Sequence, residues 1–115
     1  MVKAVQRLPK TDAGRAIGKQ LLRSGTSVAA NYRAVGRARS KAEFIAKMGV
    51  VVEEADDTVF WLELLVDTSI VRKEIVTGLL TEANELLRIF AASLGTAKAR
   101  SKRFESVKSF VDPMS

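Results

Sequence analysis

Apolar residues recur at alternating steps of three and four along most of the chain, a spacing that places them on one face of an α-helix. The two prolines, Pro9 and Pro113, lie near the chain ends, so no proline interrupts the long apolar patterns between them. The spacing predicts a short segment followed by three long helices, over residues 2–8, 13–37, 40–67 and 70–94.

Polar residues and glycines mark the expected ends of these helices. Ser40 and Glu43 form a capping box, in which Ser40 accepts from the Glu43 amide while the Glu43 side chain reaches back. Either Thr11 or Asp12 is expected to cap the first long helix. Glycines follow the last apolar positions of the first and third long helices, so we expect these helices to end at Gly36 and Gly95.

Similar helix lengths and short connections predict antiparallel neighbours. The expected fold class is therefore all-α, an antiparallel up-down helical bundle. Residues 1–98 form a single helical bundle domain, and residues 99–115, where the apolar spacing is lost, are expected to be a mobile C-terminal tail. Gly14 and Gly18 are expected to permit the close approach of another helix to the first long helix.

The 115-residue chain contains neither histidine nor cysteine. This composition excludes a cysteine nucleophile, an imidazole base, a disulfide and a zinc site of the usual Cys/His kind. We therefore expect no enzyme activity, no metal site and no cofactor. The apolar runs are far shorter than the roughly 20 residues that cross a membrane, and no signal peptide is visible, so we expect a cytoplasmic protein with no membrane partner.

Charge changes sign along the chain, although the total is only +6. Residues 1–50 carry a net charge of +9, residues 51–95 a net charge of −6 and residues 96–115 a net charge of +3. On a helical wheel, the cations of the first long helix fall within about 80° of one another, opposite its apolar face. A stripe of one sign is typical of surfaces that bind phosphate backbones. The residues expected to bind RNA or DNA are Arg15, Lys19, Arg23, Arg33, Arg37, Arg39 and Lys41.

Two other interpretations of this basic stripe stay open. A charged stripe opposite a core face is often only a solvated face, although such faces usually mix both signs. The stripe could also meet an acidic helix of a neighbouring subunit. Residues that could play that acidic part are Glu53, Glu54, Asp56 and Asp57. This acidic cluster could share a divalent cation, but a solvated or salt-bridging face is the favoured interpretation because bundle metal sites combine carboxylates with histidine.

The helix over residues 40–67 carries a second apolar strip beside its core face, formed by Val50, Phe60, Trp61 and Leu64. A second strip requires a second partner helix, from the same chain or from another copy. We expect these four residues to form an oligomer interface.

Most remaining aromatic residues follow the apolar faces. Tyr32, Phe44 and Phe90 are expected to lie in the core rather than to stack on bases. Asn31 lies on the apolar side of the first long helix, so we expect a buried amide that hydrogen-bonds to a neighbouring helix.

Several motifs together resemble a known family. They include Leu8-Pro9-Lys10, a Ser27-Val28-x-x-Asn31 element within residues 18–33 and an Arg39-Ser40-Lys41-x-Glu43-Phe44 element within residues 36–45. Further matching stretches are residues 53–56, 61–64 and 82–87. Over nearly all of residues 8–98, the chain resembles the bacterial four-helix-bundle proteins encoded in intervening sequences of 23S ribosomal RNA genes.

This family is similar to the accessory variability proteins of diversity-generating retroelements, which form pentameric, positively charged barrels that bind nucleic acid and a reverse transcriptase. The resemblance therefore implies a homopentamer with nucleic-acid affinity and a reverse transcriptase as a further partner. Family members have a full helix before the Leu-Pro-Lys turn, whereas here only residues 1–8 precede it. The expected architecture is thus of the four-helix-bundle type with a shortened first helix, and the uncovered apolar groove favours oligomerisation.

The expected function is that of a non-catalytic, oligomeric helical-bundle protein. It binds the RNA or DNA backbone through the basic stripe, with little base specificity. The alternative is a protein-interaction scaffold, in which the charged faces serve contacts within the oligomer or with an acidic partner.

Overall fold

The structure is a computed structural model that describes residues 1–112, and its four elements are all α-helices. The elements are α1 (Val2–Gln6), α2 (Asp12–Val35), α3 (Lys41–Asp67) and α4 (Lys73–Val111). No strand occurs within residues 1–112, which confirms the all-α fold class.

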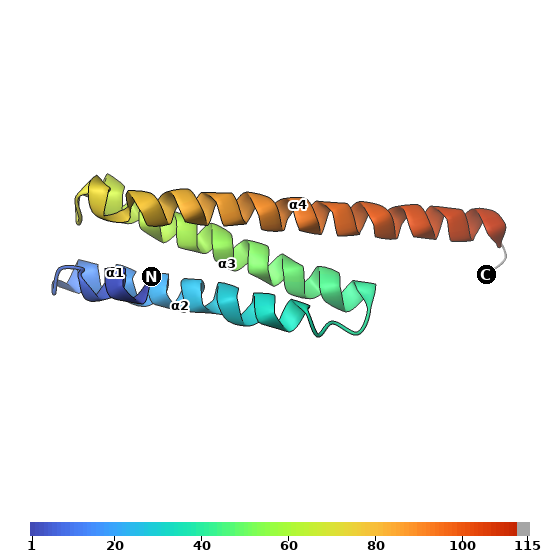
Figure 1. Ribbon diagram of the computed structural model, residues 1–115, viewed down its shortest axis with the longest axis horizontal. Helices are drawn as coiled ribbons and strands as arrows, with labels where there is room; N and C mark the ends of the chain where they lie inside the picture. Colours follow the sequence, from blue (N-terminus) through green and yellow to red (C-terminus); the bar gives the residue numbers. More distant parts are fainter. Residues whose placement is uncertain (113–115) are drawn as a thin grey trace.

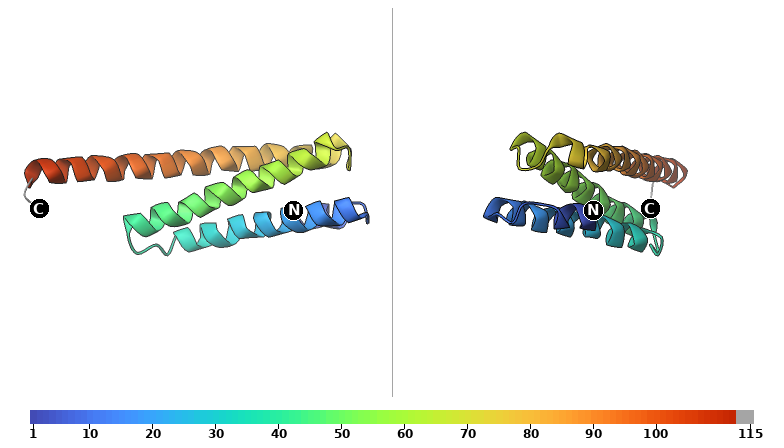
Figure 2. Two further views of the ribbon diagram at one scale, coloured as in Figure 1. Left: turned by 180° about the vertical axis from the view of Figure 1, so that it is seen from behind. Right: turned by 60° about the vertical axis from the view of Figure 1, so that its left-hand side comes forward.

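The central helix of the bundle is α3, which packs against α2 on one side and α4 on the other, while α1 packs on α2. The long helices alternate in direction, so the bundle has the expected up-down topology (Figure 1). In each view α3 runs obliquely between α2 and α4 (Figure 2). The N-terminus lies beside the middle of α2, and α4 extends far beyond the connection between α2 and α3 (Figure 1).

Side-chain caps begin α2 and α3, as the sequence predicts, but only the Ser40 half of the capping box forms among the described residues, because the Glu43 carboxylate pairs with Lys47 Nζ at 3.3 Å. Thr11 Oγ1 accepts a hydrogen bond from the Gly14 amide at 3.1 Å, and Ser40 Oγ accepts one from the Glu43 amide at 3.1 Å. These caps satisfy backbone amides of the first turn, which have no carbonyl partner within the helix. The helix α2 ends at Gly36, which confirms that boundary as well.

The expected end of the last helix at Gly95 is wrong, because α4 continues through this glycine to Val111. A glycine inside a helix costs only about 1 kcal/mol relative to alanine, and the alanines, lysines and arginines that follow favour the helix. Residues 99–111 are therefore helical. The expected mobility of residues 99–115 stays a prediction, and residues 113–115 lie outside the described residues.

Two clusters of buried side chains hold the bundle together. The cluster near the α1–α2 and α3–α4 connections consists of Leu8, Ile17, Leu21, Leu62, Leu65 and Val76. The cluster near the α2–α3 connection consists of Val35, Met48, Val51, Ala55 and Phe90. Both clusters follow the apolar spacing of the sequence, so periodicity alone locates most of the core.

Glycines on α2 allow α1 and the connection after it to lie close to this helix, and the expected approach of another helix is confirmed at Gly18, where a Cβ would lie 3.3 Å from Val5 of α1. A Cβ atom at Gly14 would lie 2.3 Å from the carbonyl oxygen of Pro9, and one at Gly18 would lie 3.0 Å from Leu8 Cδ1. Farther along, a Cβ at Gly25 would lie 3.3 Å from the side chain of Met1. The short α1 thus covers α2 only as far as Gly25.

Candidate nucleic-acid interface

The helix α2 carries most of the basic stripe. All seven residues of the stripe are exposed, whereas Ile17, Leu21 and Val35 of the same helix are buried in the core. From Arg15 to Arg33 the stripe extends over about 27 Å of α2 at 1.5 Å per residue, and Arg37, Arg39 and Lys41 follow in the α2–α3 connection and at the start of α3. Residues 13–42 include no acidic side chain, so the charged side chains of this segment have a single sign.

Two members of the stripe are engaged within the chain, Lys41, whose Nζ lies 5.4 Å from the centre of the Phe104 ring of α4, and Arg23. Arg23 Nη1 lies 3.2 Å from Glu54 Oε2, and Arg23 Nη2 lies 3.8 Å from Asp57 Oδ2. The side chain of Glu54 is only 18% exposed, whereas that of Asp57 is 53% exposed. Arg23 therefore ties α2 to α3 and is a weaker candidate for a phosphate contact than the other six residues.

The same ion pairs account for half of the acidic cluster. Glu54 and Asp57 are one turn apart on α3 and face a guanidinium, while Glu53 and Asp56 are exposed. Within residues 1–112 no group of three or more acidic side chains is arranged to hold a metal ion. The cluster thus serves in part to pair with α2 of its own chain.

The second apolar strip of α3 is divided between the core and the surface. Trp61 and Leu64 are half-buried against the core cluster that contains Leu21, and the Trp61 ring meets the Phe60 ring edge-on at 4.9 Å. Phe60 remains 52% exposed and Val50 40% exposed. Part of the strip is therefore used within the chain, and its role in an oligomer stays a prediction.

The structure corrects two of the polar and aromatic assignments on α2. Tyr32 is 53% exposed rather than buried, although its ring lies 5.1 Å from that of buried Phe90. Asn31 does not hydrogen-bond to a neighbouring helix but donates through Nδ2 to the carbonyl oxygen and hydroxyl of Ser27 on its own helix. The polar contact that does join two helices, between buried Ser24 and Thr58, is not apparent in the sequence because both residues occupy ordinary core positions.

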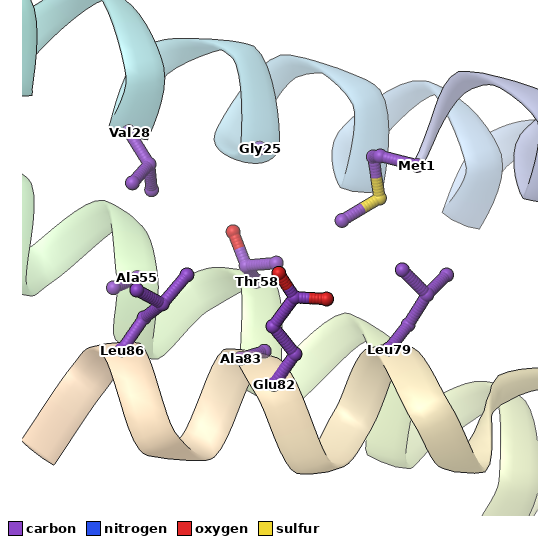
Figure 3. Close-up of a pocket in the computed structure, with 9 residues that line it drawn as sticks. All are labelled: Met1, Gly25, Val28, Ala55, Thr58, Leu79, Glu82, Ala83 and Leu86. Atoms are coloured by element: carbon purple, nitrogen blue, oxygen red, sulfur yellow. The ribbon is translucent and has the colours of Figure 1, made fainter.

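The exposure of Tyr32 reflects an open groove between α2 and α4 that begins beside Met1, at the N-terminal end of α1. Its inner part is a hollow of about 220 Å³ beside Met1, floored by Ala55 and Thr58 of α3. Figure 3 shows the Met1 side chain and the carboxylate of Glu82 extending into the space between the two helices. The structure thus contains an uncovered groove between α2 and α4.

Comparisons with known proteins agree with this architecture. The family model described as "23S rRNA-intervening sequence protein" matches residues 1–92. A crystal structure of a protein with unknown function from the S23 ribosomal protein family of Bacteroides thetaiotaomicron superposes with a TM-score of 0.64 at 36% sequence identity. The superposition covers 68% of this chain and 72% of the other. A comparison with curated proteins gave no match. Across residues 1–112, no helix combines the length and the apolar character needed to cross a bilayer.

Proposed function

The chain belongs to the 23S rRNA-intervening sequence protein family, and we propose that it is a non-catalytic, oligomeric protein that binds the backbone of RNA or DNA. The observation that carries the proposal is the basic stripe, whose seven residues are all exposed and belong to a segment, residues 13–42, without an acidic residue. Solvated helix faces usually mix the two signs, whereas phosphate-binding surfaces do not.

The geometry of the stripe suits contacts with phosphates rather than with bases. Arg15 and Lys19 are one helical turn apart on α2, about 6 Å along the axis, and Arg33 lies on the same helix. Cations at this spacing can contact several phosphates of one strand, which carries a charge about every 3.4 Å along the duplex axis. Phosphate contacts position a protein without reading sequence, so we expect similar affinities for different sequences.

The assembly in this proposal is a homo-oligomer, for which the resemblance to retroelement accessory proteins implies five copies. The same resemblance implies a reverse transcriptase as a further partner. Neither partner changes the role of the basic stripe in this proposal. The homo-oligomer, alone or with a reverse transcriptase, would present several stripes to one nucleic acid.

The decisive experiment reverses charge within the stripe. We expect Arg15→Glu/Lys19→Glu to weaken binding to labelled RNA and DNA of mixed sequence by at least tenfold at about 50 mM salt, where phosphate contacts are strongest. The matched control is Arg72→Glu/Arg88→Glu, which makes the same change in net charge at exposed positions outside the stripe. Fluorescence anisotropy would measure both, and undetectable binding by the unmodified protein would refute the proposal.

The scaffold alternative is favoured by one specific observation. Arg23 already pairs with the acidic cluster of α3, so basic and acidic surfaces of this chain are complementary, and other stripe residues could dock on a neighbour. Light scattering on Arg15→Glu/Lys19→Glu separates the two functions. Loss of the oligomer supports the scaffold, whereas an intact oligomer that no longer binds nucleic acid supports the proposed function.

A further inference from the structure

The groove between α2 and α4 exposes a row of apolar side chains. Tyr32, Leu86 and Ile89 remain 53%, 39% and 54% exposed. They border two adjoining hollows, one beside Met1 and Val28 and the other beside Tyr32 and Ile89. Exposed apolar rows of this kind mark interaction surfaces.

The open part of this groove has a definite length. At one end Met1 closes it, because its side chain lies against Gly25. At the other end it reaches Gly36, where α2 stops. The eleven residue steps from Gly25 to Gly36 correspond to about 16 Å at 1.5 Å per step, which suits a helical segment of three turns.

The far end of α4 is a helix with a largely exposed apolar face, of which the Phe104 ring lies 5.4 Å from Lys41 Nζ at the start of α3. Residues 99–111 extend beyond the connection between α2 and α3, over about 20 Å (Figure 1). Phe104, Val107 and Val111 follow one another at steps of three and four and are 58%, 56% and 74% exposed. Such a face is stable in water only at a cost, so it too requires a covering surface.

The two surfaces match in charge as well as in length. Glu82 is the one charged side chain that lines the groove, and Figure 3 shows it extending into the hollow. Residues 98–112 carry five cations and two acidic residues, a net charge of +3. A helix from this segment would bring basic groups to the rim of a groove that contains a carboxylate.

We propose that the groove between α2 and α4 receives the projecting end of α4, residues 99–111, from a second copy of this chain. The projecting end cannot reach the groove of its own chain, because both belong to one continuous helix. The contact joins two different surfaces, so it can close as a reciprocal pair or as a ring. The inference rests on the self-association in the proposed function and is independent of nucleic-acid binding.

Charged substitutions on each surface test the contact. Val107→Asp/Val111→Asp alters the projecting end and Ile89→Asp alters the groove, all at exposed positions that leave the buried core intact. We expect either variant to shift the molar mass in light scattering from an oligomer to the 12.6 kDa monomer, with an unchanged helical circular dichroism spectrum. Val2→Asp, at a position 53% exposed outside both surfaces, is the control and should keep the oligomer.

Cross-linking provides a second test that does not depend on loss of assembly. The chain has no cysteine, so Val107→Cys and Ile89→Cys can be made as two separate single-cysteine proteins and mixed. We expect the mixed disulfide to form at least fivefold faster than in a mixture of Val107→Cys with Arg88→Cys. Arg88 is exposed and adjacent in sequence, but it lies about 100° away around the helix.

The outcomes separate this inference from the broader proposal. An oligomer that survives both groups of groove and tail variants but dissociates on Phe60→Asp would overturn the inference and place the interface on the second strip of α3. A monomeric unmodified protein would overturn self-association altogether, while nucleic-acid binding would still be decided by Arg15→Glu/Lys19→Glu.

Discussion

Gly14 is the residue at which the polypeptide approaches α2 most closely. Its missing side chain leaves room for the carbonyl oxygen of Pro9, which would lie 2.3 Å from a Cβ atom. Gly49 on α3 offers the opposite environment, because nothing lies within 4 Å of a Cβ built there. The two glycines therefore separate a packing requirement from helix propensity.

We predict that Gly14→Ala destabilises the protein and Gly49→Ala stabilises it. The first substitution gains about 1 kcal/mol of helix propensity but forces the backbone at Pro9, in the α1–α2 connection, away from α2, at a cost of about 1–3 kcal/mol. The second gains propensity of up to about 1 kcal/mol with no clash. Urea unfolding followed by circular dichroism would measure both, and equal stabilities of the two variants would show that Pro9 moves without cost.

Ser69 carries the turn from α3 into α4 with a left-handed backbone, at φ 58°. This conformation costs a residue with a Cβ about 1 kcal/mol, and glycine adopts it readily. We predict that Ser69→Gly raises the free energy of unfolding by about 0.5–1 kcal/mol and that Ser69→Val lowers it. Thermal unfolding would check the order of the three proteins, and a destabilised Ser69→Gly would mean that the serine side chain has a role of its own.

The residues predicted correctly from sequence are those whose roles are local. The caps at Thr11 and Ser40 depend on amides three residues away, so their spacing is sufficient to identify them. Tyr32 was misplaced because its exposure depends on how far α1 extends over α2, which no local pattern contains. Asn31 was misplaced because Ser27, one turn before it, provides a partner within the same helix.

At the scale of helices, the pairing of α2 with α3 includes one buried polar contact. Thr58 Oγ1 lies 3.0 Å from Ser24 Oγ and 2.8 Å from the carbonyl oxygen of Glu54, while Ser24 donates to the carbonyl oxygen of Leu21. Both residues are at most 5% exposed and lie between the two apolar clusters in sequence. A hydroxyl in this environment needs its partner, so the contact favours one register of the two helices.

We predict that Ser24→Ala and Thr58→Val are coupled. Each alone should destabilise the protein by about 1 kcal/mol, and the double variant by less than the sum, with a coupling energy of about 0.5–1.5 kcal/mol. A parallel cycle of Ser24→Ala with Thr77→Val is the control, because Thr77 is exposed and bonds to its own helix at Lys73. Equal coupling in the two cycles would contradict a direct hydrogen bond.

The length of α4 is the main difference between the expected and observed elements. Gly95 resembles a helix end in the sequence, yet the helix passes through it and continues for sixteen residues to Val111. A glycine commonly ends a helix by adopting the left-handed conformation, and none of the glycines among the described residues has a positive φ. Sequence periodicity thus located the helices and most of the core, while the extent of α4 depends on which apolar faces find partners.

At the scale of the whole molecule, the chain is elongated and open. Its radius of gyration is 18.4 Å, against about 13 Å for a compact domain of this size, and its longest dimension is 63 Å. Two features cause this shape, the open groove beside the short α1 and the projecting end of α4 (Figure 1). In the proposed contact a second copy covers both of these surfaces, so the same two features account for the elongated shape and for the assembly.

The salt dependence of nucleic-acid binding can report how many copies contact one strand. A single copy offers six stripe residues besides Arg23, so its affinity for duplex DNA should fall with a log–log slope no steeper than about −5. We predict a slope steeper than about −5 for the assembled protein. For Val107→Asp/Val111→Asp, whose stripe is unaltered, we predict a slope of about −5 or shallower. Anisotropy titrations at several salt concentrations would measure the slopes. Equal slopes for the two proteins would mean that one stripe binds alone and that assembly serves another purpose.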